Sequence, residues 1–232
     1  MSDEPQPERD PLSANESPPT PELGVSRVAI IYGVMTLFGW GMAQWLLDHS
    51  PLSWSGLEAP GPLWRTVLLG AGLGAAVALL DLVLERLIPA MRQMGEAFYE
   101  LLGVMTPGRA LTFAICSAVG EEVLFRGWLL PWTAELAQAG AELVGVGAGF
   151  SGWTWIGVAL SSVLFGAMHV PPDRRLWIWP LLAAMMGVLF GWLFVYTGDL
   201  LAPILAHFTI NYFGFMRLSH RWSAEANTDE AP

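Results

Sequence analysis

Residues 109–131 read RALTFAICSAVGEEVLFRGWLLP, an almost wholly apolar run that is interrupted by three charged residues just beyond its middle. A helix rises ~1.5 Å per residue, so a run of this length can cross the ~30 Å hydrocarbon core of a membrane. The three charged residues are Glu121, Glu122 and Arg126. Because charges are costly in lipid, this helix is predicted to turn them toward the interior of a helical bundle.

The whole chain has the composition of a membrane protein. Of its 232 residues, 53% are apolar and only 14% are charged, whereas charged residues make up ~25% of soluble domains. The mean hydropathy is +0.46. The single cysteine, Cys116, excludes an intrachain disulfide and a cysteine-cage metal site. The net charge of −10 lies mostly in the two ends of the chain, and nothing in the sequence favours nucleic acid as a partner.

Six apolar runs are long enough to span a membrane as helices. They are residues 25–47, 63–84, 109–131, 153–170, 176–197 and 199–217. Between the second and third runs, Met91, Met94 and Phe98 recur at helical spacing while Glu96 and Glu100 mark another face. This pattern is typical of an amphipathic helix at the membrane interface. The predicted fold class is therefore all-α, a polytopic transmembrane helical bundle with about six spanning helices and one interfacial helix.

The chain is predicted to divide into four parts. Residues 1–23 are acidic and rich in proline and lack aromatic residues, so they are expected to be a disordered N-terminal tail. Residues 24–108 are expected to form N-terminal membrane helices and the interfacial helix. Residues 109–217 are expected to form a helical core, and residues 218–232 a disordered C-terminal tail.

The arginines predict the orientation of the chain, because basic residues near helix ends stay on the cytoplasmic side. If the N-terminus is cytoplasmic, eight of the 11 arginines lie on the inner side, and Arg65 lies at an outer edge. Both termini are therefore predicted to be cytoplasmic. The chain lacks lysine and is rich in tryptophan, which favours an integral protein of a bacterial plasma (inner) membrane.

The charged residues of the third run are expected to have different roles. Glu122 and Arg126 are four residues apart and share a helix face, so they are predicted to pair. Glu121 points about 100° away and would remain unpaired in the bundle interior, where it could act as a general base. The alternative is a polar network that only locks the helices together.

Two later runs carry polar residues of the kind that catalysis needs. His207 and Asn211 are four residues apart inside the sixth run, and both offer N–H donors that could stabilise an oxyanion. His169 ends the fourth run, with Phe165 one turn earlier. The alternative for His207 and Asn211 is an interhelical hydrogen-bond pair. The number of residues between each of these side chains and the cytoplasmic end of its helix indicates that they lie at similar depths in the membrane. They therefore predict a polar cavity that opens toward the cytoplasm.

Three motifs now resemble those of one family. EEVLFRG contains Glu121, Glu122 and Arg126 and fits EExxxR; FGAMH contains Phe165 and His169 and fits FxxxH; HFTIN contains His207 and Asn211 and fits HxxxN. Together, and in this order, the motifs resemble the CPBP family of CAAX-protease and bacteriocin-processing membrane proteins, which includes the type II CAAX prenyl endopeptidases. Residues 109–217 would then be a CPBP-like catalytic core.

The resemblance implies an intramembrane glutamic endopeptidase without an obligate cofactor. It implies that Glu121 and His169 activate the hydrolytic water and that His207 and Asn211 stabilise the oxyanion. It further implies that Glu122, Arg126 and Phe165, which complete the matched motifs, support the site. The expected partners are membrane lipids and a peptide or membrane-protein substrate, while the substrate's identity and the oligomeric state stay open.

Two other functions are compatible with the same residues. A zinc-dependent membrane metalloprotease could use Glu121, His169 and His207 as its metal ligands, although no HExxH pair is present and Asn211 would have no role as a ligand. A non-catalytic immunity or scaffold protein could bind a partner through the polar pocket. The complete set of Glu, two His and Asn argues against this last function.

Overall fold

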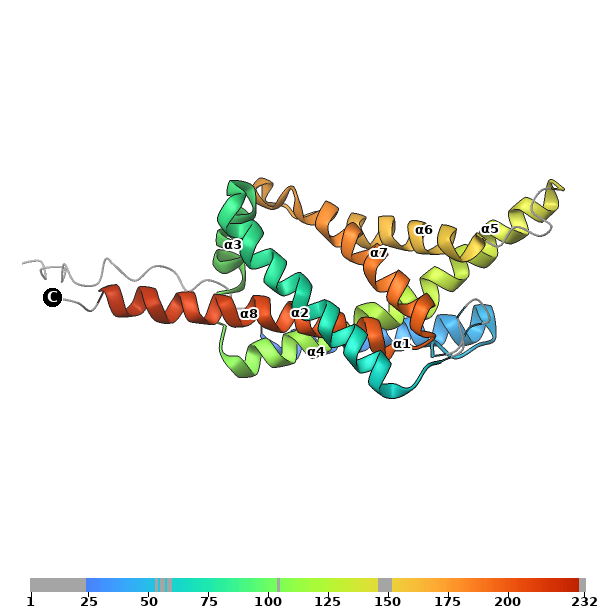
Figure 1. The fold of residues 1–232 in the computed structure, drawn as a ribbon, viewed down its shortest axis with the longest axis horizontal. Helices are drawn as coiled ribbons and strands as arrows, with labels where there is room; N and C mark the ends of the chain where they lie inside the picture. Colours follow the sequence, from blue (N-terminus) through green and yellow to red (C-terminus); the bar gives the residue numbers. More distant parts are fainter. Residues whose placement is uncertain are drawn as a thin grey trace, which may run out of the picture.

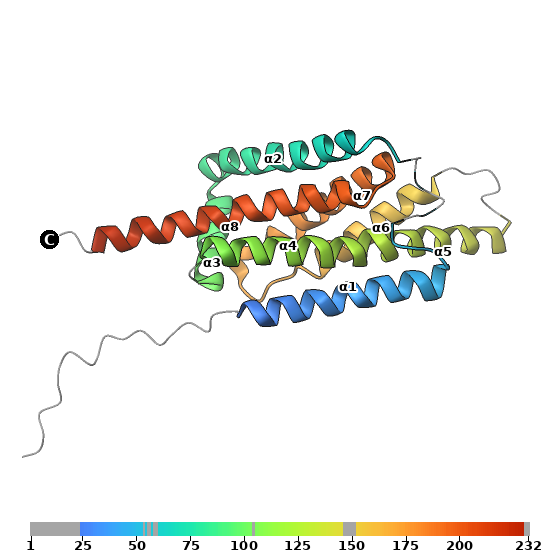
Figure 2. The same cartoon turned by 90° about the horizontal axis from the view of Figure 1, so that it is seen from below.

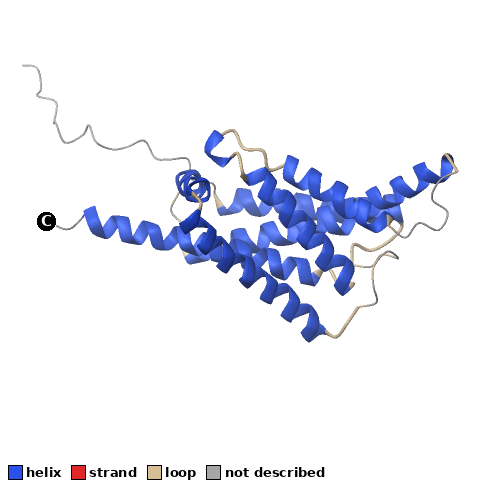
Figure 3. Ribbon diagram, turned by 45° about the horizontal axis from the view of Figure 1, so that its top comes forward, coloured by secondary structure: helices blue, strands red, loops and turns tan. Residues whose placement is uncertain are grey.

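The computed structural model describes residues 24–229 except 53, 55–56, 58–59, 104 and 146–151. The predicted tail 1–23 lies outside the described residues. The described residues form helices and loops without strands (Figure 3). The helices are α1 (Val25–Leu47), α2 (Leu63–Leu87), α3 (Pro89–Leu102), α4 (Pro107–Leu124), the π-helix η2 (Phe125–Leu129), α5 (Leu130–Leu143), α6 (Trp153–Ala167), the 3-10 helix η3 (Arg174–Leu176), α7 (Trp179–Thr197) and α8 (Leu201–Asp229). The all-α polytopic bundle predicted from the sequence is confirmed.

The long helices run back and forth through the bundle (Figure 2), and α2 and α7 are tilted relative to α8 (Figure 1). The start of α1 and the end of α8 lie at the same end of the bundle, and α3 lies across that end. Helix α5 projects beyond the other helices at the opposite end (Figure 1). This arrangement puts both ends of the described chain on one side of the bundle.

Fewer helices qualify as membrane spans by length and hydropathy than the six predicted. Three segments qualify among the described residues: α1, α2 and Arg174–Thr197. The count rises to four if α3 and the helical run Pro107–Leu143, which meet at a 104° bend, form one span. Helix α6 is too short, with 15 residues. Helices α4 and α8 are less apolar, because α4 carries two adjacent glutamates and α8 carries His207, Asn211 and Arg217.

Two predicted boundaries differ from the structure. Helices α4, η2 and α5 form one continuous helical run from Pro107 to Leu143, so the helix extends 12 residues past the end of the predicted span 109–131. Helix α8 continues to Asp229, over most of the segment predicted as a disordered tail. Alanine and glutamate, which have high helix propensity, occur in both segments and let the helix continue once packing has started it.

Helix α3 confirms the predicted amphipathic helix. Its buried residues Met91, Met94 and Ala97 pack against Leu176 of η3. On its exposed side, both carboxylate oxygens of Glu100 accept hydrogen bonds from the Arg175 guanidinium, at 3.0 and 2.7 Å. The same guanidinium also binds Asp173, and these charge-assisted bonds lower the pKa of both carboxyl groups below their ordinary values. Packing and charge together hold α3 across the end of the bundle.

Glycines let α2 and α8 approach each other closely. A Cβ atom added at Gly70 would lie 2.5 Å from the carbonyl oxygen of Ala202, and one at Gly74 would lie 2.7 Å from that of Ala206. These distances are too short for a methyl group, so the helix backbones are in direct contact. The sequence spacing of the two glycines is typical of such close contacts in membranes. Ala206 precedes His207, so this contact fixes the height and rotation of α8 at the polar residues.

Replacing Gly74 by alanine is therefore expected to destabilise the protein by about 1–3 kcal/mol, because the added methyl group must push α8 away. Thermal unfolding in detergent would measure the change. The matched control is Gly72→Ala on the exposed face of the same helix, where an added Cβ has no neighbour within 4 Å. Equal loss of stability in both variants would contradict the close α2–α8 contact.

Candidate active site

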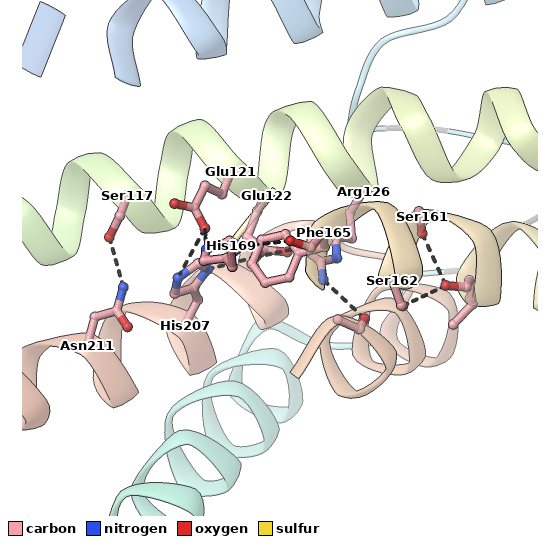
Figure 4. Close-up of polar contacts among 12 residues, drawn as sticks. Ser117, Glu121, Glu122, Arg126, Ser161, Ser162, Phe165, His169, His207 and Asn211 are labelled. Carbon is pink, nitrogen blue, oxygen red and sulfur yellow. Dashed lines mark hydrogen bonds and ion pairs between the residues drawn. The ribbon is translucent and has the colours of Figure 1, made fainter. Parts of the chain in front are cut away.

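One helical run carries the acidic half of the site (Figure 4). Glu121 and Glu122 lie in the last turn and a half of α4, and Arg126 lies in the π-helix that follows. All three are buried, with exposed fractions of 7% for Glu121, 0% for Glu122 and 1% for Arg126. A π-helical turn is rare and often marks a functional site, because it rotates the following residues relative to a regular α-helix.

Arg126 is held from several directions. Its Nη1 donates to Glu122 Oε1 at 3.0 Å, which is the pair that the sequence spacing predicts. Its Nη2 donates to the carbonyl oxygen of Gly187 on α7 at 3.1 Å. The guanidinium also lies 4.7 Å from the ring centroid of Phe165 and 5.3 Å from that of Phe190. These contacts give a buried cation both a counter-ion and cation–π partners.

His207 joins the same ion pair from α8. Its Nδ1 lies 2.8 Å from Glu122 Oε1, the oxygen that also accepts from Arg126. Since that carboxylate is an acceptor in both contacts, Nδ1 is the protonated nitrogen and donates. The imidazole ring stacks on Phe190, with centroids 4.9 Å apart and planes at 16°. Glu122 therefore orients His207 as well as neutralising Arg126.

His169 follows the last turn of α6. Its Nδ1 lies 2.6 Å from the carbonyl oxygen of Phe165, and because a carbonyl can only accept, Nδ1 carries the proton. The ring meets Phe165 and Trp179, with centroids 4.5 and 5.6 Å away. This bond satisfies a carbonyl at the end of the helix and leaves Nε2 of His169 directed toward α4.

The two histidines converge on Glu121. Glu121 Oε2 lies 3.7 Å from His207 Nε2 and 3.9 Å from His169 Nε2. Both separations are longer than a direct hydrogen bond. One carboxylate oxygen and two imidazole nitrogens thus face one small polar region inside the bundle (Figure 4).

Asn211 reaches α4 one turn away from His207. Its Nδ2 donates to Ser117 Oγ at 2.9 Å, and Ser117 Oγ in turn donates to the carbonyl oxygen of Ala114 at 3.4 Å. The sequence predicts that His207 and Asn211 project toward one point. In the structure both reach α4, but His207 bonds to Glu122 and Asn211 bonds to Ser117.

Sequence reasoning missed three contributors to the site, which are Ser117, Gly187 and Phe190. Ser117 is four residues before Glu121, and this spacing could have identified it as a neighbour on the same face. Gly187 lies at a close contact with α6, where an added Cβ would be 2.9 Å from Ser162 Cα, and its carbonyl role carries no sequence signal. No sequence signal distinguishes Phe190 from the many other aromatic residues.

Ser161 and Ser162 behave as structural residues. Both hydroxyls donate to the carbonyl oxygen of Val158 in their own helix, at 3.2 and 2.6 Å. In the part of the chain that the structure describes, no group of three His, Cys, Asp or Glu side chains has an arrangement that could hold a metal ion.

Comparison with known proteins finds a family model that matches the core. Residues 104–213 match the family model for type II CAAX prenyl endopeptidase Rce1-like proteins. This confirms the resemblance that the three motifs indicate, since all of them fall inside the matched segment. No curated protein and no solved structure matches the chain. The Rce1-like family is a protease family, so the match of this segment indicates a CAAX-type intramembrane protease.

Replacing Glu122 by glutamine is expected to destabilise the protein by roughly 3–5 kcal/mol, because Arg126 would remain buried without its counter-ion. Thermal unfolding in detergent and the yield of folded protein would show the loss. Glu100→Gln is the matched control, since Glu100 also pairs with an arginine but its side chain is 59% exposed. That change should have little effect, because solvent screens surface ion pairs. A Glu122→Gln variant as stable as the Glu100→Gln variant would contradict the assignment.

Proposed function

We propose that this Rce1-like chain is a membrane-embedded glutamic endopeptidase that cleaves a peptide or membrane protein entering from the cytoplasmic side. The observation that carries the proposal is the position of Glu121 Oε2, which faces Nε2 of both His169 and His207 at 3.9 and 3.7 Å. A water molecule can bridge polar groups at such separations. The proposal requires no obligate cofactor.

In the proposed first step, Glu121 and His169 activate the water. His169 carries its proton on Nδ1, so Nε2 has a free lone pair beside the Glu121 carboxylate. Each of these two acceptors can therefore accept a hydrogen bond from the same water molecule. Together they direct the water oxygen at the scissile carbonyl. As the O–C bond forms, one water proton passes to Glu121. The same proton then passes to the leaving nitrogen when the C–N bond breaks.

His207 and Asn211 are proposed to stabilise the oxyanion. His207 already donates from Nδ1 to Glu122, so donation from Nε2 requires the imidazolium form. With His207 protonated, two carboxylates, Glu121 and Glu122, balance two cations, Arg126 and His207, and the buried cluster is electrically neutral. The second donor is the remaining N–H of the Asn211 amide, which Ser117 holds in place. Preorganised donors of this kind stabilise charge that develops in the transition state.

The membrane orientation is proposed from the arginines. The start of α1 and the end of α8 lie at the same end of the bundle (Figure 2). Arg92 of α3, Arg175 of η3 and Arg217 of α8 belong to segments at that end. We assign this end to the cytoplasm of a bacterial plasma membrane, with lipids around the bundle, because basic residues flanking spans stay inside.

A zinc-dependent protease is the second candidate function. One observation favours it: the Nδ1 atoms of His169 and His207 are both held by oxygen acceptors, as in many zinc sites where such bonds orient the ligand nitrogens. The zinc ligands would be Nε2 of both histidines and Glu121, and the metal would polarise a water; against this candidate, the described residues do not hold these three groups in an arrangement that fits a metal ion. In that case Asn211 would have no role as a ligand.

The central test compares the wild type with Glu121→Gln. We expect the variant to fold normally but to lose hydrolysis, because the amide keeps the shape of the side chain and cannot take up a proton. Proteomic analysis of membranes would detect new protein termini that occur only with the active form and would identify the substrate. A purified fluorogenic prenylated CAAX peptide provides the second assay. Full turnover by Glu121→Gln would contradict the proposal.

Asn211→Ala separates the two candidate functions. Loss of one oxyanion donor is expected to lower kcat about 10²- to 10³-fold with little change in KM. The zinc mechanism predicts nearly unchanged turnover for this variant, and loss of both bound metal and activity for His207→Ala. Turnover and metal content should be measured on both variants, with and without chelator. Wild-type turnover in Asn211→Ala would overturn the oxyanion assignment.

A further inference from the structure

Tyr32 lies on α1, outside the motifs and outside the segment that matches the family. We propose that Tyr32 is a positioning residue for Glu121: its hydroxyl donates a hydrogen bond to the carboxylate and fixes the rotamer that directs Oε2 toward His169 and His207. This inference rests on the proposed function, because it explains how the proposed base is held. It also gives the N-terminal helices a direct part in the site.

Close backbone contact places Tyr32 beside Glu121. A Cβ atom added at Gly120 would lie 3.0 Å from both Cδ1 and the carbonyl oxygen of Tyr32, so glycine is needed for α1 to approach this closely. A second contact lies farther along the same two helices, where a Cβ at Gly39 would be 2.8 Å from Leu124 Cα. The two contacts flank Glu121 along α4 and fix α1 against it (Figure 2).

The hydroxyl and the ring of Tyr32 have different neighbours. The half-buried ring packs against a cluster that includes Val28 and Phe113. The contact at Gly120 places the ring beside the residue before Glu121, so the hydroxyl can reach the Glu121 carboxylate. Tyrosines in apolar surroundings commonly use the ring for packing and the hydroxyl for one specific hydrogen bond. Removal of the hydroxyl alone should therefore leave the helix contact intact.

Glu121 needs such a donor because its other neighbours do not hold it. The Nε2 atoms of the two histidines lie beyond direct hydrogen-bond distance from Oε2. Arg126 donates its hydrogen bonds to Glu122 and to the carbonyl oxygen of Gly187. A charge-assisted bond from a phenol is stronger than a neutral one and restrains the carboxylate rotation. An unrestrained carboxylate would sample rotamers in which no oxygen faces the histidines.

The test is Tyr32→Phe, with Tyr212→Phe as the matched control. Tyr212 packs in the same cluster, and its described contacts are with the rings of Phe208 and Phe213. With the fluorogenic prenylated CAAX peptide as probe, we expect kcat of Tyr32→Phe to fall about 10- to 100-fold while KM stays within about twofold. Tyr212→Phe should keep wild-type values. Unchanged kcat in Tyr32→Phe, with Glu121→Gln inactive, would overturn the inference and leave the proposed function standing.

A second measurement does not depend on activity. The thermal midpoint should be measured for wild type, Tyr32→Phe, Glu121→Ala and the double variant, since coupled residues are non-additive. We expect Tyr32→Phe to lower the thermal midpoint of the wild type. In the Glu121→Ala background, the same change should not lower the midpoint further. Equal shifts in both backgrounds would mean a merely structural tyrosine and would reject the inference. If Glu121→Gln keeps wild-type turnover, the proposed function fails, and this cycle alone decides the role of Tyr32.

Discussion

The buried carboxylate of Glu122 is the interaction on which the rest of the site depends. One of its oxygens accepts from Arg126 in the same helical run and from His207 on α8. Arg126 continues the connection to the carbonyl oxygen of Gly187 on α7. Three separate helical segments are thus joined through one fully buried ion pair. Because the surroundings are apolar, loss of any partner leaves an uncompensated charge, and this strongly favours a single arrangement of the helices.

Close packing of helix backbones supplies the remaining precision. Because Gly74 has no side chain, α2 contacts Ala206, the residue before His207. Because Gly120, the residue before Glu121, has none, α1 contacts α4 at that point. Both contacts involve backbone atoms, which move less than long side chains. The site is therefore built on rigid helices rather than on loops, as catalytic groups that must hold fixed distances require. The packing of α1 and α2 also explains how the N-terminal helices, which carry none of the three motifs, help to position the motif residues.

Local spacing decides which parts of this site could be predicted from the sequence. The Glu122–Arg126 pair follows from the four-residue spacing in one helix, and the amphipathic α3 follows from its periodicity. The bonds of His207 to Glu122 and of Asn211 to Ser117 depend on how α8 is rotated against α4, which no local pattern encodes. For the same reason Tyr32 carried no signal. The length of α8 and the continuous run from α4 through α5 were missed because helix ends depend on packing as much as on composition.

The central claim is that Glu121 activates water rather than attacking the peptide itself. A single turnover in H2¹⁸O, with enzyme in excess over a prenylated CAAX peptide, tests this claim most directly. If Glu121 and His169 activate the water, the new carboxyl terminus of the product contains ¹⁸O after the first turnover and the Glu121 side chain remains unlabelled. A product with only ¹⁶O, together with ¹⁸O in the carboxylate of Glu121, would show a covalent glutamyl intermediate and would contradict the account.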